Sequence, residues 1–142
     1  MNKGLAILAC AFGLAACAPP DAPVAGEPVP AVPAEIAALA HIYTFNVAES
    51  PHEDCLLKLD ADDVDAGEGV VRLAWIDPRC YEAFPVLQAL NQWAPIGSSG
   101  IRLIDNESGA IMDLLVVSDI SGEYWSGAAA DGKTYELRTP SW

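Results

Sequence analysis

Five acidic side chains lie close together in the first half of the chain, and clustered carboxylates supply the oxygen ligands that calcium prefers. They are Asp60, Asp62, Asp63, Asp65 and Glu68. Their spacing does not match an EF-hand loop, because Asp65 stands where that loop requires glycine. We therefore interpret the cluster as the solvated tip of a hairpin and predict no bound metal.

Residues suited to catalysis or zinc binding do not form a known pattern. The two histidines, His41 and His52, are far apart in sequence and do not form the His-Glu-x-x-His pattern of a zinc protease. The stretch 97–100, Gly-Ser-Ser-Gly, lacks the spacing of a nucleophile elbow and is typical of a loop. The sequence therefore predicts a protein that is not an enzyme, with no catalytic residue and no cofactor.

The N-terminus carries a signal of a different kind. Lys3 precedes an apolar run over residues 4–16 that is too short to anchor a protein across a bilayer, and small alanines end it. With Cys17 next, the pattern resembles the lipobox of bacterial lipoprotein signal peptides. That resemblance implies cleavage before Cys17 and acylation of its sulfur and amine, and Ala18 then favours the outer membrane. An ordinary secretory signal is the alternative.

Composition limits the mature protein to one acidic domain. Removing residues 1–16 from the 142 leaves 126, enough for a single core. The 20 acidic residues then face 6 basic ones, because Lys3 leaves with the signal, and the net charge is −14. Such a charge repels nucleic acid and anionic headgroups and favours basic partners.

Two cysteines remain for the folded part, Cys55 and Cys80, since Cys10 belongs to the signal and Cys17 to the lipid anchor. In an oxidising envelope such a pair is expected to form a disulfide. Closing this loop would stabilise the fold by about 3 to 4 kcal/mol. A catalytic or metal-binding thiol pair would need closer spacing and nearby histidines.

A change of composition separates a tether from the folded domain. Residues 18–33 hold six prolines and four alanines, a composition that cannot build a core. In polyproline II geometry this stretch would reach about 50 Å. Pro33 suits the first position of a short helix over 34–39, because its missing amide would be unpaired there.

After residue 40, short runs of β-branched and aromatic residues alternate with turn signals, which predicts an all-β domain. The eight predicted strands are 41–48, 54–60, 68–76, 91–96, 101–105, 110–118, 122–128 and 133–139. A short helix or helical loop is predicted within 78–90, where Pro85 limits any longer helix. This pattern suits either a closed barrel or a sandwich, and an eight-stranded barrel holds its own side chains or one small ligand.

Four aromatic residues are expected in the core or as plugs at the ends of the sheet: Trp75, Tyr81, Phe84 and Trp93. Tyr124 and Trp125 are neighbours in a predicted strand and must point to opposite faces. One of them is therefore expected to be exposed, and Trp125 is a candidate contact for a partner.

Several residues, in this order, look like the bacterial inhibitors of serralysin-type metalloproteases, which include an outer-membrane lipoprotein. They are Cys55-Leu56-Leu57-Lys58-Leu59, Cys80, Trp93, Ile101-Arg102-Leu103-Ile104-Asp105, Gly109 and the stretch from Gly132 to Arg138. The resemblance covers about residues 36–139. The chain departs from it where His41-Ile42-Tyr43 replaces a Gly-x-Trp.

The resemblance implies a compact eight-stranded antiparallel barrel with one Cys55–Cys80 disulfide. It also implies that residues ahead of the barrel enter the cleft of the protease, where a free terminal amine approaches the zinc. An acylated Cys17 cannot do this, so occlusion by Pro33, Ala34, Glu35 and Ile36 is the mechanism expected here.

The sequence thus predicts a signal peptide over 1–16, a lipidated tether over 17–33 and a barrel over 34–142. The expected function is inhibition of a secreted or periplasmic metalloprotease by a monomer anchored in the outer membrane. Two alternatives stay open: a non-inhibitory interaction module of the envelope, and a lipocalin-like carrier of one small apolar ligand.

Overall fold

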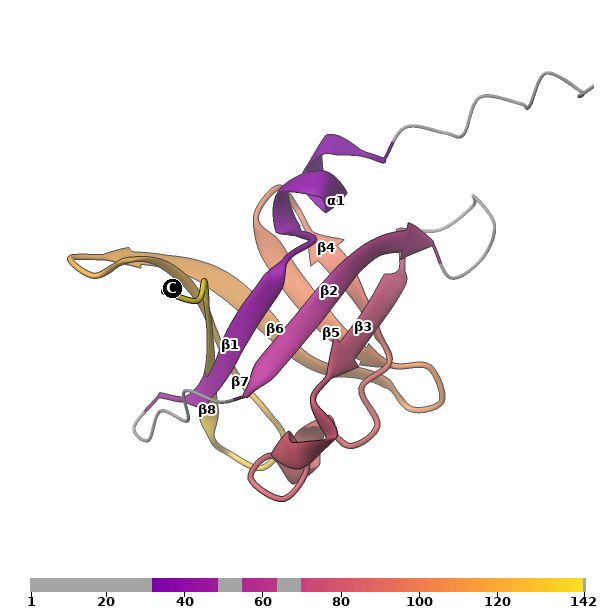
Figure 1. The fold of residues 1–142 in the computed structure, drawn as a ribbon, viewed down its shortest axis with the longest axis vertical. Coiled ribbons are helices and arrows are strands. Elements are labelled where there is room, and N and C mark those ends of the chain that lie inside the picture. Colours follow the sequence, from indigo (N-terminus) through magenta and orange to yellow (C-terminus); the bar gives the residue numbers. More distant parts are fainter. Residues whose placement is uncertain (1–31, 49–54, 64–69, 142) are drawn as a thin grey trace, which may run out of the picture.

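Eight antiparallel strands close into a barrel in the computed structural model, which describes residues 32–48, 55–63 and 70–141 (Figure 1). Each strand pairs with the next along the chain, and β1 pairs with β8, so the sheet has no free edge along its closed part. This confirms the predicted barrel and excludes the sandwich. The strands are β1 (Ile42–Val47), β2 (Leu56–Asp63), β3 (Arg72–Ile76), β4 (Gln92–Ile96), β5 (Gly100–Asp105), β6 (Gly109–Asp119), β7 (Gly122–Ala128) and β8 (Thr134–Arg138).

Side chains that point inward fill the barrel. Along β1, for example, Tyr43 and Phe45 are fully buried, whereas Ile42 is exposed. This alternation arises because successive side chains of a strand point to opposite faces of the sheet. Trp93 is fully buried, and its indole Nε1 donates to the carbonyl of Asp60 at 2.8 Å. The other large, fully buried side chains include Leu57, Leu59, Ile76, Leu87, Ile101, Leu103, Tyr135 and Leu137.

Short helical segments close the two ends of the barrel. Helix α1 (Ala34–Leu39) packs against β2 and β4 at one end. The helix predicted over 34–39 is confirmed. Two turns of 3-10 helix, η1 (Pro78–Cys80) and η2 (Pro85–Leu87), lie at the other end and confirm the predicted helical loop. There Phe84 packs edge-on against Phe45, with ring centroids 5.3 Å apart.

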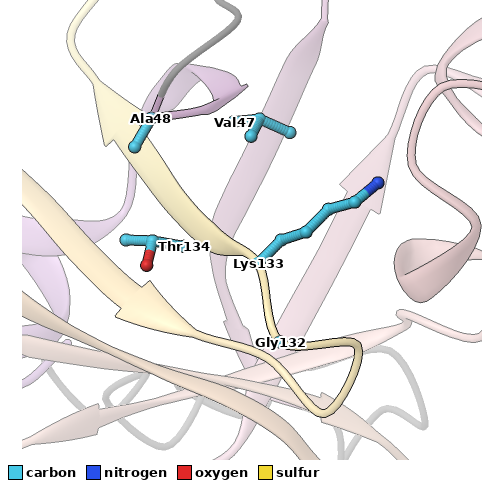
Figure 2. Close-up of a pocket in the computed structure, with 5 residues that line it drawn as sticks. All are labelled: Val47, Ala48, Gly132, Lys133 and Thr134. Carbon is cyan, nitrogen blue, oxygen red and sulfur yellow. The ribbon is translucent and has the colours of Figure 1, made fainter.

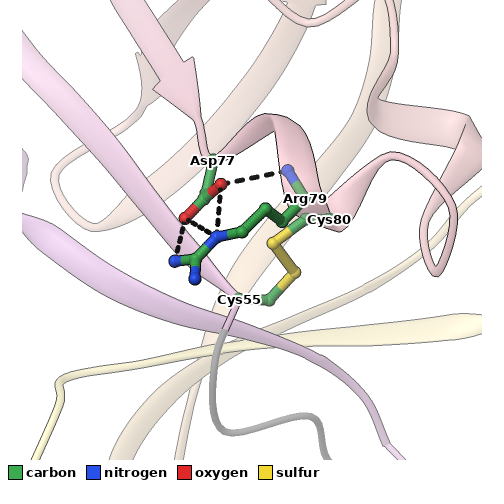
Figure 3. The surroundings of a disulfide bond; sticks show 4 residues. All are labelled: Cys55, Asp77, Arg79 and Cys80. Carbon is green, nitrogen blue, oxygen red and sulfur yellow. Dashed lines mark hydrogen bonds and ion pairs between the residues drawn. A yellow bond between two sulfur atoms is a disulfide. The ribbon is translucent and has the colours of Figure 1, made fainter.

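A disulfide joins Cys55, directly before β2, to Cys80 in η1 and so ties the closing segment to the barrel wall (Figure 3). Asp77 fixes the start of η1, because its carboxylate accepts a hydrogen bond from the backbone amide of Arg79 at 3.0 Å. The guanidinium of Arg79 also pairs with this carboxylate and holds the pKa of Asp77 below its usual value. The predicted Cys55–Cys80 bond is confirmed.

Some predicted positions were wrong. Strand β2 continues to Asp63, so Asp60 and Asp62 belong to a strand instead of a hairpin tip, and a register shift against β3 accommodates the extra length. Trp75 is 52% exposed on the outer face of β3, because it pairs with the outward Lys58, and it is not a core residue. Strand β3 begins at Arg72 rather than at 68. His52, Asp65, Glu68, Cys17 and the ranges 1–16 and 17–31 lie outside the described residues.

Gly127 gives a direct test of how closely the barrel is packed. A Cβ atom at this position would lie 1.9 Å from the carbonyl oxygen of Asp113 in the neighbouring strand. Gly127→Ala should therefore lower the free energy of unfolding by about 3 kcal/mol or more, because backbone atoms of β6 must move. Urea unfolding of both proteins measures the change, and equal stability would contradict the observed approach of β6 to β7.

Candidate functional site

The end of the barrel that carries α1 is the candidate site, because the predicted contact residues lie there. Strands of an up-and-down barrel alternate in direction, so the β2–β3, β4–β5 and β6–β7 connections share this end with α1. The β1–β2, β3–β4, β5–β6 and β7–β8 connections share the other end. We call these the α1 end and the opposite end (Figure 1).

Helix α1 is held in the barrel mouth by two of its side chains. Ile36 and Leu39 are 1% and 3% exposed and belong to the core cluster. The helix begins after Pro33, whose carbonyl accepts a hydrogen bond from the amide of Ala37 at 2.9 Å. Among the predicted contacts, Pro33, Ala34 and Glu35 are exposed. Ile36 is a core residue in this structure, so its side chain stabilises the helix instead of facing outward.

A chain of contacts joins α1 to two strands and to the β4–β5 turn. The hydroxyl of Tyr43 donates to the carbonyl of Leu39 at 2.8 Å, and burial raises the pKa of Tyr43 to about 12, which keeps it a donor. The ring of Tyr43 meets that of Trp125 edge-on at 5.3 Å. Trp125 in turn donates from Nε1 to the carbonyl of Ser99 in the β4–β5 turn at 2.6 Å.

Trp125 is therefore a half-buried brace under the α1 end. Its neighbour Tyr124 points to the outer face, where the guanidinium of Arg138 lies 4.0 Å from the ring centroid. The predicted opposite orientation of these two aromatics is confirmed. The prediction that one of them is exposed was wrong, because both are half-buried and each ring contacts another side chain.

Metal-binding groups do not gather in the described part of the chain. No set of three or more His, Cys, Asp or Glu side chains within it is placed to hold a metal ion. Asp60, from the acidic cluster, instead pairs with Lys58 at 2.6 Å on the outer face of β2. The exposed His41 lies just before β1, with its ring 6.1 Å from that of Tyr43. Within the same residues, no helix has the length and hydropathy needed to cross a membrane.

A surface hollow of about 370 Å³ lies at the opposite end of the barrel (Figure 2). Val47 and Ala48 line it from the end of β1, and residues 132–134 line it from the turn before β8. Next to it, Asp131 accepts a hydrogen bond from the hydroxyl of Tyr135 at 2.5 Å, which lowers the pKa of Asp131. This bond closes the β7–β8 turn.

Comparison with known proteins identifies the architecture. No family model matches the chain, and no curated protein matches its sequence. Among solved structures, it is similar to the crystal structure of a psychrophilic marine protease MP inhibitor, with a TM-score of 0.50 and 19% identity. The chain shares the fold of a protease inhibitor. The match covers 74% of this chain and 98% of the inhibitor, so it spans nearly all of that protein.

One exposed residue at the α1 end was not singled out from the sequence. Ile120 lies at the tip of the β6–β7 hairpin with a relative exposure of 108%. An isoleucine between Asp119 and Ser121-Gly122 is an unusual turn residue, because hairpin turns favour Gly, Asn, Asp and Ser. The presence of isoleucine among typical turn residues was the signal in the sequence that could have identified Ile120.

Trp125→Phe tests the bracing role of Trp125. The variant retains an aromatic ring against Tyr43 but leaves the carbonyl of Ser99 without the indole donor, so the free energy of unfolding should fall by about 1 to 2 kcal/mol. Trp75→Phe is the matched control on the outer face and should change stability by less than about 0.5 kcal/mol. Equal effects of the two substitutions in urea unfolding would contradict the brace.

Proposed function

We propose that this protein binds and inhibits proteases from the outer membrane, to which acyl chains on Cys17 anchor it. It acts by occlusion, with the α1 end turned toward the protease and the segment before the barrel entering the cleft. The target class is a secreted or periplasmic metalloprotease of the serralysin type. The protein is a monomer and performs no catalysis of its own.

The observation that carries this proposal is the barrel held in common with a protease inhibitor over 98% of that inhibitor's chain. It agrees with the resemblance seen in the sequence, where the two cysteines and the downstream Trp93 occur in the order typical of metalloprotease inhibitors. In the structure the two cysteines form the disulfide and Trp93 is buried in the core, so both features of this pattern have a structural role.

The geometry at α1 suits an inhibitor that presents an extended segment. The chain enters the described fold at Val32, and Ile36 and Leu39 fix the next turn of helix in the barrel mouth. Residues 33–35 are thus exposed but held by a rigid body. Binding at such a site loses little conformational entropy, which favours affinity.

The chemistry of the same segment supports occlusion over coordination by a terminal amine. Pro33 has no amide hydrogen and proline-rich backbone is a poor substrate, so the segment would fill a cleft without being cut. Glu35 is exposed and offers a carboxylate that can face a metal in the partner. The acylated amine of Cys17 would take no part.

The carrier alternative is disfavoured by the filled interior. Trp93, Tyr43, Phe45, Phe84 and Tyr135 are each at most 1% exposed, and their rings occupy the space that a ligand would need. The interaction-module alternative differs from the proposal in activity alone, so titration against a panel of proteases separates the two.

A substitution pair tests the occluding segment. Ala34→Arg places a long cation beside the proposed contact and should raise the inhibition constant at least about tenfold, because a close-packed contact cannot hold the added side chain. Ala130→Arg is the matched control, an exposed alanine at the opposite end, and should leave the constant within about twofold. Equal constants for both variants would exclude the segment from the contact.

The anchor has its own test in the cell. Cys17→Ser should move the protein from the membrane fraction to the soluble fraction, because acylation of the sulfur is lost. Cys10→Ser is the matched control within the signal and should leave the protein in the membrane fraction. Mass spectrometry of the mature N-terminal peptide measures the acyl chains directly. A Cys17→Ser protein that stays with the membrane would contradict the lipid anchor.

A further inference from the structure

The last turn of the β6–β7 hairpin extends beyond the closed barrel. Strand β5 pairs with β6 as far as Leu114, and β8 pairs with β7 from Trp125 onward. Residues 117–119 therefore pair with residues 122–124 alone, and Val116 pairs with Trp125 at their base. This two-stranded projection, which we call the arm, reaches out sideways from the barrel, with Ile120 at its tip (Figure 1).

The tip of the arm is held in one conformation by polar contacts. The carboxylate of Asp119 accepts hydrogen bonds from the amide of Ser121 at 2.7 Å and from its hydroxyl at 2.5 Å. Arg138 donates to the same hydroxyl at 3.3 Å. Gly122 completes the turn with φ of +115°, a value that an L side chain rarely adopts. Ile120 is thus presented to solvent from a fixed turn.

Among the described residues, seven large apolar side chains are exposed: four lie on segments at the end where the arm begins, and Leu73, Trp75 and Leu115 lie on β3 and β6. Within the described residues, Val32, Ile42, Val70 and Ile120 all lie at the α1 end and are 42% to 108% exposed. Exposed apolar residues that are scattered singly have no special meaning. Ile120 differs from the others because a polar-locked turn presents it almost wholly to solvent. Val32 and Pro33, which precede α1, are exposed at this same end.

Charge decides which partner fits this surface. With a net charge of −14 after removal of the signal, the protein is repelled by anionic lipid headgroups, which disfavours insertion of the arm into a membrane. A protein pocket has no such penalty. Protease clefts are concave and lined with apolar side chains, and a preorganised β-branched residue fits such a pocket with little loss of entropy.

We propose that the arm is a second contact element for the inhibited protease, and that Ile120 enters an apolar pocket beside the cleft that residues 33–35 occlude. This inference rests on the proposed inhibitory function and adds a residue that determines specificity. Both contacts lie on segments at the α1 end of the barrel, where a single protease can reach both.

The test uses the whole protein, processed by the cell and purified in detergent, titrated against serralysin-type metalloproteases. Ile120→Ser should raise the inhibition constant about 10-fold to 100-fold, the range expected when a buried isoleucine contact is lost. Leu73→Ser is the matched control: Leu73 is 43% exposed on the outer face of β3, and its variant should inhibit like the wild type. Ile120→Leu should restore inhibition to within about threefold.

The outcomes separate the two proposals. A wild type that inhibits while Ile120→Ser inhibits equally well overturns the arm contact and leaves the inhibitory function standing. A wild type without inhibition of any protease in the panel overturns both. A loss shared by Ile120→Ser and Leu73→Ser, with unchanged thermal unfolding, also overturns the specific role of the tip.

Discussion

The interior of an eight-stranded barrel has room for its own side chains, and this constraint governs the rest of the molecule. Trp93, Tyr43, Phe45 and Tyr135 fill that interior, and the two open ends must then be closed by other parts of the chain. Helix α1 closes one end with Ile36, and the disulfide-linked segment containing Phe84 closes the other. A body packed in this way has only its rims and its outer wall with which to recognise a partner.

The two ends differ in what they offer a partner. At the opposite end, Asp131 and Tyr135 close a turn, and the disulfide fixes the 3-10 segments, so polar groups there serve the fold. At the α1 end, Tyr43 and Trp125 brace the base while apolar side chains remain exposed above it. Structural rigidity beneath an exposed apolar rim is the arrangement expected of a binding surface.

Much of the fold could be predicted, because it follows from local patterns. Runs of β-branched and aromatic residues between turn signals located the eight strands. Pro33 located the start of α1, and cysteine usage indicated the Cys55–Cys80 bond. The errors arose where the pairing of strands decides to which face of the sheet a side chain points. Trp75 looked like a core residue by type, yet its register with Lys58 turns it outward, and no sequence pattern gives that register. Ile36 and Trp125 were predicted as partner contacts, but the sequence did not indicate their roles in packing. Ile36 belongs to the core cluster, and Trp125 contacts Tyr43 and Ser99, which are distant from it in sequence.

The central claim is that the protein meets a protease with its α1 end. Hydrogen–deuterium exchange of the intact protein, alone and bound to a protease that it inhibits, tests this directly. The account predicts slower exchange on binding in residues 32–42 and in the arm at 116–124, with no change in the β5–β6 and β7–β8 turns. Protection confined to those two turns, at the opposite end, would contradict it.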